Sequence, residues 1–314
     1  KDLAKGSDAL AVDIVLPGLE NQRGLVSKGE NCVLTAGYGQ GLRKLPDMYA
    51  MKIIYGPRAK NAGLSIENTV RLNIRLYSKA SGKPVNQIKV LVLDRPRHKE
   101  LKEDLRAAGI IEENIILVKN DDLTPAIAVM LGDAIDLIIG VGGTPELIAA
   151  AIIARSLGGG VSWRLVPDEA EYYGDVVKRK SNWDNFSKSR DDILRNFGIL
   201  RPGSPDTSNS VRRWSDTGCA RDLVFGDDFF FTACAITDWD VQSWGIEGYT
   251  KIAGVSRPDK DGDVCAHILQ IGASGEVKVL KVTYATAIGI YKRAPKSRLS
   301  LTRLAIEYAE YGMI

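Results

Sequence analysis

The sequence contains few of the residues that build the commonest metal and hydrolase sites. Its only histidines are His98 and His267, and its four cysteines include no CxxC pair. A structural zinc site draws its ligands mainly from cysteine and histidine, and a Ser–His–Asp triad needs a histidine beside its nucleophile. The sequence therefore argues against both kinds of site and favours a reduced, intracellular setting.

Long apolar segments and clustered charge are also lacking. The longest apolar run, "LIAAAIIA" at 147–154, is far shorter than the ~20 residues that span a bilayer, so it predicts a buried helix and no membrane span. The formal charge is only +3, and Lys and Arg are mixed with Asp and Glu. This pattern is typical of a solvated surface and argues against nucleic acid as a partner.

The apolar runs that are present predict an α/β fold. Strands are expected at 9–16, 32–36, 50–55, 88–94, 114–119 and 134–140, and helices at 65–79, 98–109, 124–132 and 144–157. Strands that alternate with helices of about ten residues indicate a parallel, doubly wound sheet. Beyond residue 160 we expect a helix at 191–197, an exposed loop at 198–222, strands at 222–237, 266–272 and 277–286, and a helix at 298–313.

The stretch "IIGVGGTPEL" at 138–147 combines a glycine-rich turn with the start of a helix. A dinucleotide fingerprint needs a third glycine where Pro145 stands, so a phosphate seat at the helix N-terminus, formed at Gly143, is the favoured interpretation. Glu146 would repel a phosphate there unless a divalent cation lay between them, which suggests metal-assisted phosphoryl chemistry. Alternatively, Glu146 only offsets the helix dipole.

Charged residues follow two neighbouring strands of the predicted sheet. Arg95 and Arg97 stand in "DRPRHKEL" after the strand at 88–94, and Asp121 and Asp122 stand in "KNDDL" after the strand at 114–119. Ligands of open α/β sheets bind at the carboxyl ends of the strands, and arginine suits bidentate phosphate capture. These strand ends therefore predict a binding cleft.

The motifs "PDMY", "GPRAK", "GKP", "LDRPRHKEL", "GVGGTPE" and "TACAIT", in this order, resemble the class II fructose-1,6-bisphosphatases. The match looks closest to the photosynthetic fructose/sedoheptulose-bisphosphatases of the lithium-sensitive phosphatase superfamily, and covers about residues 8–160 and, more loosely, 223–285. It implies carbohydrate metabolism, a layered α/β sandwich of the sugar-phosphatase type, and Mg²⁺ or Mn²⁺. By this resemblance the sugar-phosphate residues are Tyr49, Arg95, Arg97, Asp121, Asp122 and Gly143, and the metal ligands are Glu20 and Glu146.

The same resemblance marks departures at the metal site. Where the family reads V-D-I-A-V-D-P-I/C-E-G-T, this chain reads "VDIVLPGLENQ", with Pro17 in place of a ligand Asp and Gln22 in place of the Thr that positions the attacking water. The family's N-terminal segment, with further ligands, has no counterpart, so we expect an incomplete N-terminal layer. Two Mg²⁺ ions with a bisphosphate need more carboxylates than Glu20 and Glu146. We therefore expect no catalytic residue and no cofactor, with Mg²⁺ or Mn²⁺ only if phosphatase activity is retained.

These observations favour a degenerate, non-catalytic bisphosphatase-like protein that serves as a structural subunit of a larger assembly. Other protein subunits are the expected partners, and aromatic residues such as Trp214, Trp239 and Trp244 could supply the contact surface, with burial in the core as the alternative. Two other functions remain open: an active fructose-1,6-/sedoheptulose-1,7-bisphosphatase whose N-terminus is missing from the sequence, and a metal-free sugar-phosphate sensor.

We expect five segments along the chain. They are a remnant of the N-terminal phosphatase domain at 1–85, a parallel α/β domain at 86–175, an exposed insertion at 176–222, a returning β-rich segment at 223–290 and a helical extension at 291–314. The expected location is soluble and intracellular, in the plastid stroma or another organelle matrix or else in the cytoplasm. Because the sequence begins with Lys rather than Met, the lack of a targeting segment decides little between these.

Overall fold

The computed structural model describes residues 8–15, 33–40, 42–43, 45, 49–119, 123–132, 134–166, 199–200, 212–213, 216–235, 238–254, 256 and 263–283. The helices expected at 191–197 and 298–313, Trp214, and the candidate residues Glu20, Asp121 and Asp122 lie outside these ranges. No helix in the described ranges is long and apolar enough to cross a membrane.

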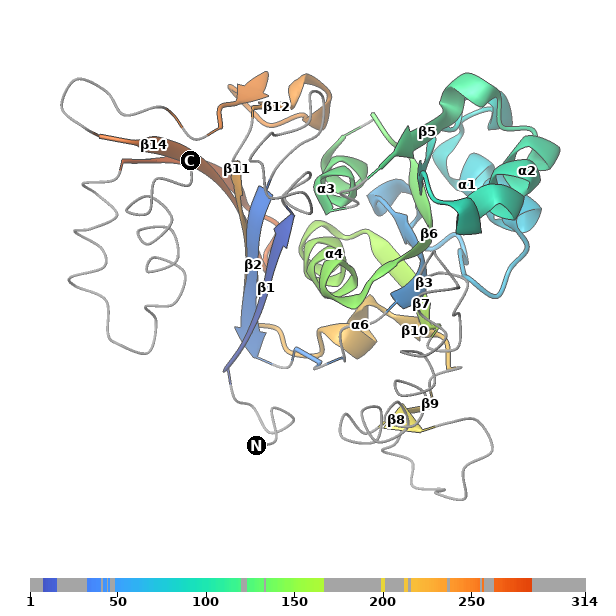
Figure 1. Cartoon of the computed structure of the whole chain (residues 1–314), viewed down its shortest axis with the longest axis horizontal. Helices are drawn as coiled ribbons and strands as arrows, with labels where there is room; N and C mark the ends of the chain where they lie inside the picture. Colours follow the sequence, from blue (N-terminus) through green and yellow to red (C-terminus); the bar gives the residue numbers. More distant parts are fainter. Residues whose placement is uncertain are drawn as a thin grey trace, which may run out of the picture.

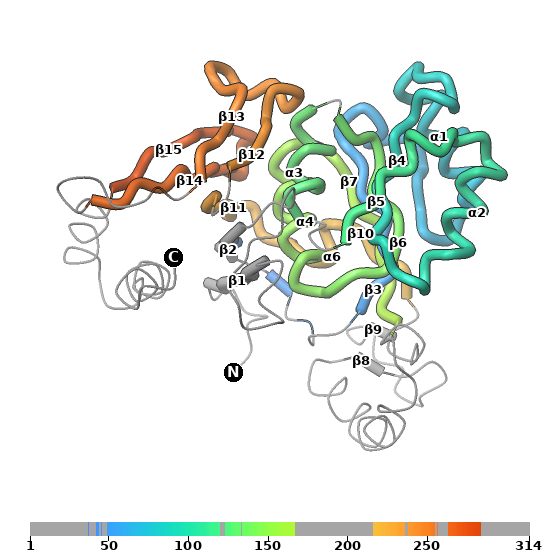
Figure 2. The backbone as a smooth tube through the Cα atoms, turned by 45° about the horizontal axis from the view of Figure 1, so that its top comes forward, coloured from blue at the N-terminus to red at the C-terminus, as the bar shows by residue number. Residues whose placement is uncertain are grey.

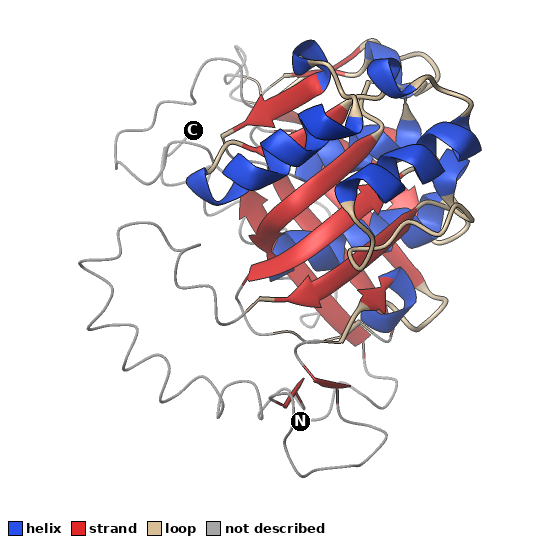
Figure 3. Ribbon diagram, turned by 90° about the vertical axis from the view of Figure 1, so that its right-hand side faces the viewer, coloured by secondary structure: helices blue, strands red, loops and turns tan. Residues whose placement is uncertain are grey.

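Two β-sheets and two pairs of helices stack in alternating layers (Figure 1). The six-stranded sheet has the order β10 (Gly218–Cys219), β7 (Gly160–Leu165), β3 (Tyr49–Tyr55), β6 (Leu137–Gly143), β4 (Val90–Leu93) and β5 (Ile115–Val118). Helices α1 (Val70–Ser81) and α2 (Lys99–Ala108) cover its outer face, as Figure 3 also shows. Helices α3 (Leu123–Leu131) and α4 (Thr144–Leu157) fill the space between the sheets. The layered α/β fold expected from the sequence is confirmed.

The second sheet has five strands, joined antiparallel at every pairing. Its order is β1 (Asp8–Val15), β2 (Val33–Gln40), β11 (Phe229–Ala235), β14 (Cys265–Gly272) and β15 (Val277–Thr283). Two short pairs add β8 (Ile199–Leu200) with β9 (Arg212–Arg213), and β12 (Trp239–Asp240) with β13 (Lys251–Ile252). Single helical turns stand at Pro57–Ala59, Val85–Gln87, Pro96–His98, Glu112–Asn114 and Gln242–Trp244, and a four-residue helix, α6, at Ala220–Leu223.

The six-stranded sheet is mixed, whereas the sequence predicted a parallel one. Strands β4, β5 and β6 are parallel, as their strand–helix alternation requires, but β3 runs antiparallel to both β6 and β7. Figure 2 shows β3, early in the chain, lying among strands that follow much later. Strands from both sides of the boundary predicted at residue 85 thus share one sheet. The five-segment division itself stays a prediction.

Two local predictions were wrong, and one strand was not predicted. The glycine-rich "GVGG" is not a loop, because β6 continues through Gly143 as the partner of β3. Strand β7 follows α4 directly and is absent from the expected strands, because the glycines at 158–160 obscure its apolar pattern. The expected exposed loop at 198–222 includes β10, which pairs with β7, and Ala220, which is buried; a tight apolar contact there outweighs the polar composition of the surrounding stretch.

Helix α4 is the centre of the molecule. The residues buried along it lie on all its sides: Thr144, Leu147, Ile148, Ala149, Ala150, Ala151, Ile152, Ile153, Ala154 and Ser156. A helix that is apolar all round must be covered all round. One continuous core cluster accordingly joins α3 and α4 to both sheets, and a second joins α1 and α2 to the outer face of the six-stranded sheet.

The aromatic segment at 239–244 belongs to the core and not to the surface. Trp239 is fully buried and Trp244 is 5% exposed, with ring centroids 6.2 Å apart. In β11, Phe229 and Phe231 face the core, whereas Phe230 is 41% exposed. The prediction that these two tryptophans form a contact surface is therefore wrong, because they are buried in the core beside α3.

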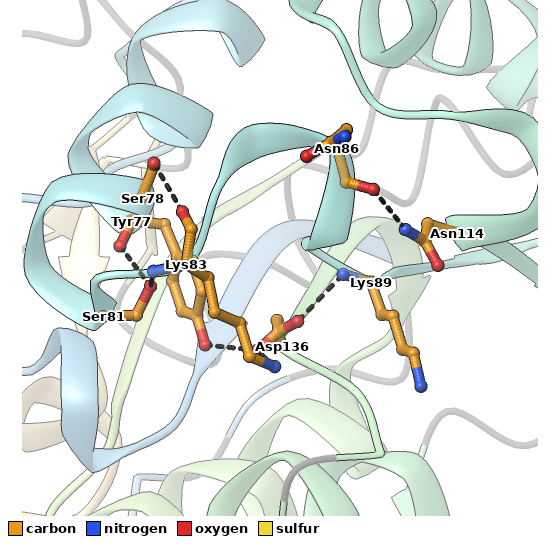
Figure 4. A network of polar contacts seen from close by, with 8 residues as sticks. All are labelled: Tyr77, Ser78, Ser81, Lys83, Asn86, Lys89, Asn114 and Asp136. Atoms are coloured by element: carbon orange, nitrogen blue, oxygen red, sulfur yellow. Dashed lines mark hydrogen bonds and ion pairs between the residues drawn. The ribbon is translucent and has the colours of Figure 1, made fainter.

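A buried carboxylate joins α1 to the beginnings of β4 and β6 (Figure 4). Asp136 is 3% exposed and accepts hydrogen bonds from the Tyr77 hydroxyl at 2.6 Å, from Lys83 Nζ at 2.8 Å and from the Lys89 backbone N–H at 2.9 Å. A buried carboxylate is stable only when hydrogen bonds replace its hydration. This network lies at the end of the sheet opposite to the carboxyl ends of β4 and β6.

Candidate functional site

The candidate site lies where strands β4 and β6 separate at their carboxyl ends. The two strands pair only at Val90 with Leu137 and at Leu91 with Ile138. Beyond this point β6 continues beside β3 to Gly143, while the chain leaves β4 through the turn at 94–98 and enters α2. A separation of neighbouring strands at this end is the usual ligand position in α/β sheets.

Side chains of the turn replace the missing strand partner of β6. His98 Nε2 accepts a hydrogen bond from the Val141 N–H at 2.9 Å, and Arg97 Nη2 donates to the Val141 carbonyl at 2.8 Å. In a strand, the N–H and C=O of one residue point to the same side. Both backbone groups of Val141 therefore face the turn and are satisfied by two consecutive side chains.

Arg97 also contacts Tyr49, the first residue of β3. The guanidinium carbon lies 4.8 Å from the centre of the Tyr49 ring, within the range of a cation–π contact. Tyr49 is the register partner of Gly143. The structure thus brings Tyr49, Arg97 and Gly143 together, whereas Arg95, half-buried at the start of the same turn, is placed by its position in the chain alone.

Gly143 and Glu146 form the N-terminus of α4. Gly143 is the N-cap and Glu146 stands in the first turn, after Pro145. A Cβ atom at 143 would meet the Glu146 carboxylate, which is the far end of a flexible side chain and could move aside, so Gly143 marks how closely this carboxylate lies to the start of the helix. A carboxylate folded back onto a helix N-terminus is stabilised by the helix dipole and by the exposed N–H groups there. We call Tyr49, Arg97, Gly143 and Glu146 the Arg97 corner.

The charge state of His98 follows from its position. Burial lowers the pKa of His98 from 6.5 to about 4, and the neighbouring Arg97, Lys102 and Arg95 lower it as well, against the opposite effect of the hydrogen bond to Leu93. The imidazole is therefore neutral at neutral pH. Its Nδ1 lies 2.7 Å from the Leu93 carbonyl, which can only accept, so Nδ1 carries the proton and Nε2 is the acceptor for Val141.

Two buried residues at the site were missed by sequence reasoning. His98 was considered only for zinc or a triad, although its place directly after "DRPR" was a signal. Lys52 is 2% exposed on β3 and pairs with Gly140. It lies on the same face of β3 as Ala50 and Ile54, towards α3 and α4. A lysine inside the apolar run "AMKIIY" was the signal for it, since lysine is rarely buried.

The described residues do not by themselves make a site for a divalent cation. Mg²⁺ takes several oxygen ligands in octahedral geometry. In the ranges that the structure describes, no group of three or more His, Cys, Asp or Glu side chains could hold a metal ion. Glu146 is the one described carboxylate of the implied set, and it lies in the first turn of α4. Glu20, Asp121 and Asp122 are outside the described residues.

The chain is similar in sequence to known proteins of one family. The sequence model of the family described as bacterial fructose-1,6-bisphosphatase, glpX-encoded, matches residues 2–244. A D-fructose 1,6-bisphosphatase class 2/sedoheptulose 1,7-bisphosphatase of Trichodesmium erythraeum is 29% identical over 241 residues, which are 76% of this chain and 63% of that protein. Its counterpart in Synechocystis is 28% identical, with the same coverage. The fructose-1,6-bisphosphatase class 2 of Haemophilus influenzae is 28% identical over 67% of this chain and 56% of its own length. The chain spans less than two thirds of the length of these relatives.

Proposed function

Because the chain belongs to the family of glpX-encoded bacterial fructose-1,6-bisphosphatases, we propose that it binds a sugar phosphate at the Arg97 corner without hydrolysing it. In this proposal the chain needs no metal cofactor and serves as a structural subunit of a larger assembly. The observation that carries the binding is the contact of Arg97 with both Tyr49 and Val141 beside the N-terminus of α4.

The Arg97 corner has the chemistry of an anion site. A guanidinium fixed between an aromatic ring and a backbone carbonyl loses little side-chain entropy when it binds a phosphate, and its planar donors match two phosphate oxygens. The N-terminus of α4 adds backbone N–H donors and a partial positive charge. An aromatic ring such as that of Tyr49 offers an apolar wall for the sugar.

The sequence at the metal motif and the position of Glu146 support the loss of hydrolysis. Pro17 has no side-chain ligand to offer, and Gln22 places a longer amide side chain where the family has a short hydroxyl. Glu146 lies over the N-terminus of its own helix, where a carboxylate is stabilised without any metal. Without several carboxylates around a divalent cation, neither water activation nor neutralisation of the phosphate charge is available.

The outward face of the five-stranded sheet supports the role as a subunit. Phe230 on β11 is 41% exposed and Leu280 on β15 is 39% exposed. Ile268 on β14, half-buried, pairs directly with Leu280. Leu280 lies level with Cys234, four residues along β11 from Phe230, so the exposed apolar side chains are spread along this face, and such side chains favour contact with another protein.

The alternative is a metal-dependent hydrolase that acts on fructose 1,6-bisphosphate or sedoheptulose 1,7-bisphosphate. The names of the relatives favour it, since they describe enzymes of both activities. The alternative requires that carboxylates outside the described residues complete a metal site with Glu146. It predicts turnover that depends on Mn²⁺ or Mg²⁺, whereas the non-catalytic proposal predicts none.

One experiment separates the two. Purified protein is incubated with Mn²⁺ and fructose 1,6-bisphosphate, phosphate release is measured, and the melting temperature is recorded with and without the sugar. We expect no turnover and a ligand-induced stabilisation that Arg97→Met abolishes. The matched control is Arg106→Met, since Arg106 forms an exposed ion pair with Glu112 away from the site. Turnover at ordinary phosphatase rates would show that the alternative is right.

The role as a subunit has its own test. In extracts of the source cells, we expect the chain to migrate in native gels with a complex larger than a homodimer. Phe230→Ser together with Leu280→Ser should release it, whereas Lys281→Ser, at the exposed residue that follows Leu280 in β15, should not. Migration of the unaltered chain as a monomer would refute this part of the proposal.

A further inference from the structure

His98 is the one imidazole in the described site, and it is built into the backbone of two strands. It is 2% exposed, with Nδ1 2.7 Å from the Leu93 carbonyl at the end of β4 and Nε2 2.9 Å from the Val141 nitrogen in β6. The ring therefore spans the gap that opens where β4 and β6 separate. It supplies a donor to one strand and an acceptor to the other.

Gly140 makes this approach possible. Its φ angle is +151°, a conformation that residues with side chains rarely adopt, and an added Cβ would lie 3.0 Å from His98 Nε2. The glycine one residue before Val141 thus leaves space for the ring edge. The glycines of β6 therefore serve two neighbours: Gly140 leaves space for His98, and Gly143 is the N-cap of helix α4.

The hydrogen bond to Val141 connects His98 to the Arg97 corner. Arg97, the preceding residue, holds the carbonyl of the same Val141. The next residues of β6 are Gly142 and Gly143, and Gly143 pairs with Tyr49. A strand of consecutive glycines has no side chains to fix its position, so its polar backbone contacts have a larger part in holding it.

We propose that His98 is a positioning residue, whose imidazole holds β6 at Val141 so that Arg97, Tyr49 and Gly143 form one anion-binding surface. His98 does not touch the ligand in this scheme. The effect on binding rests on the proposed function, whereas the effect on the strand does not. Loss of the Val141 bond should leave the end of β6 free to shift against Arg97 and so weaken phosphate capture.

Two substitutions separate the two hydrogen bonds of the ring. The amide of His98→Asn can reach the Leu93 carbonyl, as Nδ1 does, but not Val141. The amide of His98→Gln can present its oxygen to the Val141 N–H, in the place of Nε2, but not serve Leu93. Fructose 1,6-bisphosphate affinity is measured by calorimetry for the whole chain, with thermal melting and with amide hydrogen exchange at Val141.

We expect the affinity for fructose 1,6-bisphosphate to fall about tenfold in His98→Asn, which corresponds to the loss of roughly one hydrogen bond. In His98→Gln the affinity should stay within about threefold of the wild type. Exchange at Val141 should accelerate in the Asn variant alone. If His98 had only a structural role, the order of the three proteins in affinity for fructose 1,6-bisphosphate would be the same as their order in melting temperature. That pattern, or equal affinity in all three proteins, would overturn the inference.

The two proposals can fail separately. If the wild type binds neither fructose 1,6-bisphosphate nor inorganic phosphate, the proposed function fails. The exchange data then decide the inference on their own: equal exchange at Val141 in the three proteins overturns it, and protection in the wild type and the Gln variant but not in the Asn variant supports it.

Discussion

Replacement of Asp136 should destabilise the protein more than any exposed charge change. Its carboxylate is 3% exposed and accepts hydrogen bonds from Tyr77, Lys83 and Lys89. In Asp136→Asn the charge that pairs with Lys83 is lost, and the new amide N–H₂ faces a donor. The ion pair, in which the Lys83 side chain is 24% exposed, contributes on the order of 1 kcal/mol and the mismatched donor on the order of 1–3 kcal/mol. We expect a loss of about 2–4 kcal/mol of unfolding free energy.

The assay is urea unfolding at pH 7, followed by tryptophan fluorescence. Glu112→Gln is the matched control, because Glu112 pairs with Arg106 at the surface and such pairs contribute less than about 1 kcal/mol. Combining Asp136→Asn with Tyr77→Phe should show a coupling energy of about 1 kcal/mol, since the two side chains share one hydrogen bond. If Asp136→Asn unfolds within about 0.5 kcal/mol of the control variant, the network does not hold α1 to the sheet as described.

Three further outcomes are expected. The pKa of His98 is lowered from 6.5 to about 4 in the folded protein, so as the pH falls the unfolded chain takes up the proton first. The unfolding free energy should therefore be unaffected by His98 above pH 6.5 and fall by about 3 kcal/mol between pH 6.5 and pH 4. In urea melts, His98→Gln should lack this decline. Gly132→Ala would place a Cβ against the backbone of residues 243 and 244, so it should cost about 1–3 kcal/mol, whereas Gly82→Ala meets no atom and should cost only its backbone strain in the same thermal melts. Arg155 donates to the carbonyls of residues 224 and 226 and stacks on a phenylalanine ring, so Arg155→Lys should lower the unfolding free energy by about 2 kcal/mol; an unchanged midpoint would contradict this.

Local signals predicted most elements of the fold. Helices α1 and α2 are followed by Gly82 and Gly109, both in the left-handed conformation, and the apolar pattern before each glycine predicted both helices, although α1 begins at Val70 and not at the expected residue 65. Strand order could not be predicted in this way. The pairing of β3 with β6 and β7 is a contact between segments far apart in the sequence, and no local pattern states which strand becomes a neighbour.

The candidate site was predictable in its members and not in its geometry. The position of Arg97 after a strand and of Gly143 before a helix placed both at the carboxyl edge of the sheet. The register that sets Tyr49 opposite Gly143 depends on antiparallel pairing, which was not foreseen. The roles of His98 and Lys52 depend on burial, and a single polar residue in a turn or strand does not reveal whether it faces solvent.

The assembly of the five-stranded sheet from both ends of the described chain has a consequence for biosynthesis. Strand β2 ends at Gln40 and its partner β11 ends at Ala235, so a ribosome that adds 5–20 residues per second leaves the β1–β2 hairpin without that partner for about 10–40 s. A two-stranded hairpin alone is marginally stable. Strands β3 to β7 and helices α1 to α4 emerge contiguously in the meantime, with one side of α4 uncovered. The nascent chain therefore presents its most apolar helix to the cell before the covering sheet can close, and chaperones that recognise exposed apolar helices are expected to act in that interval.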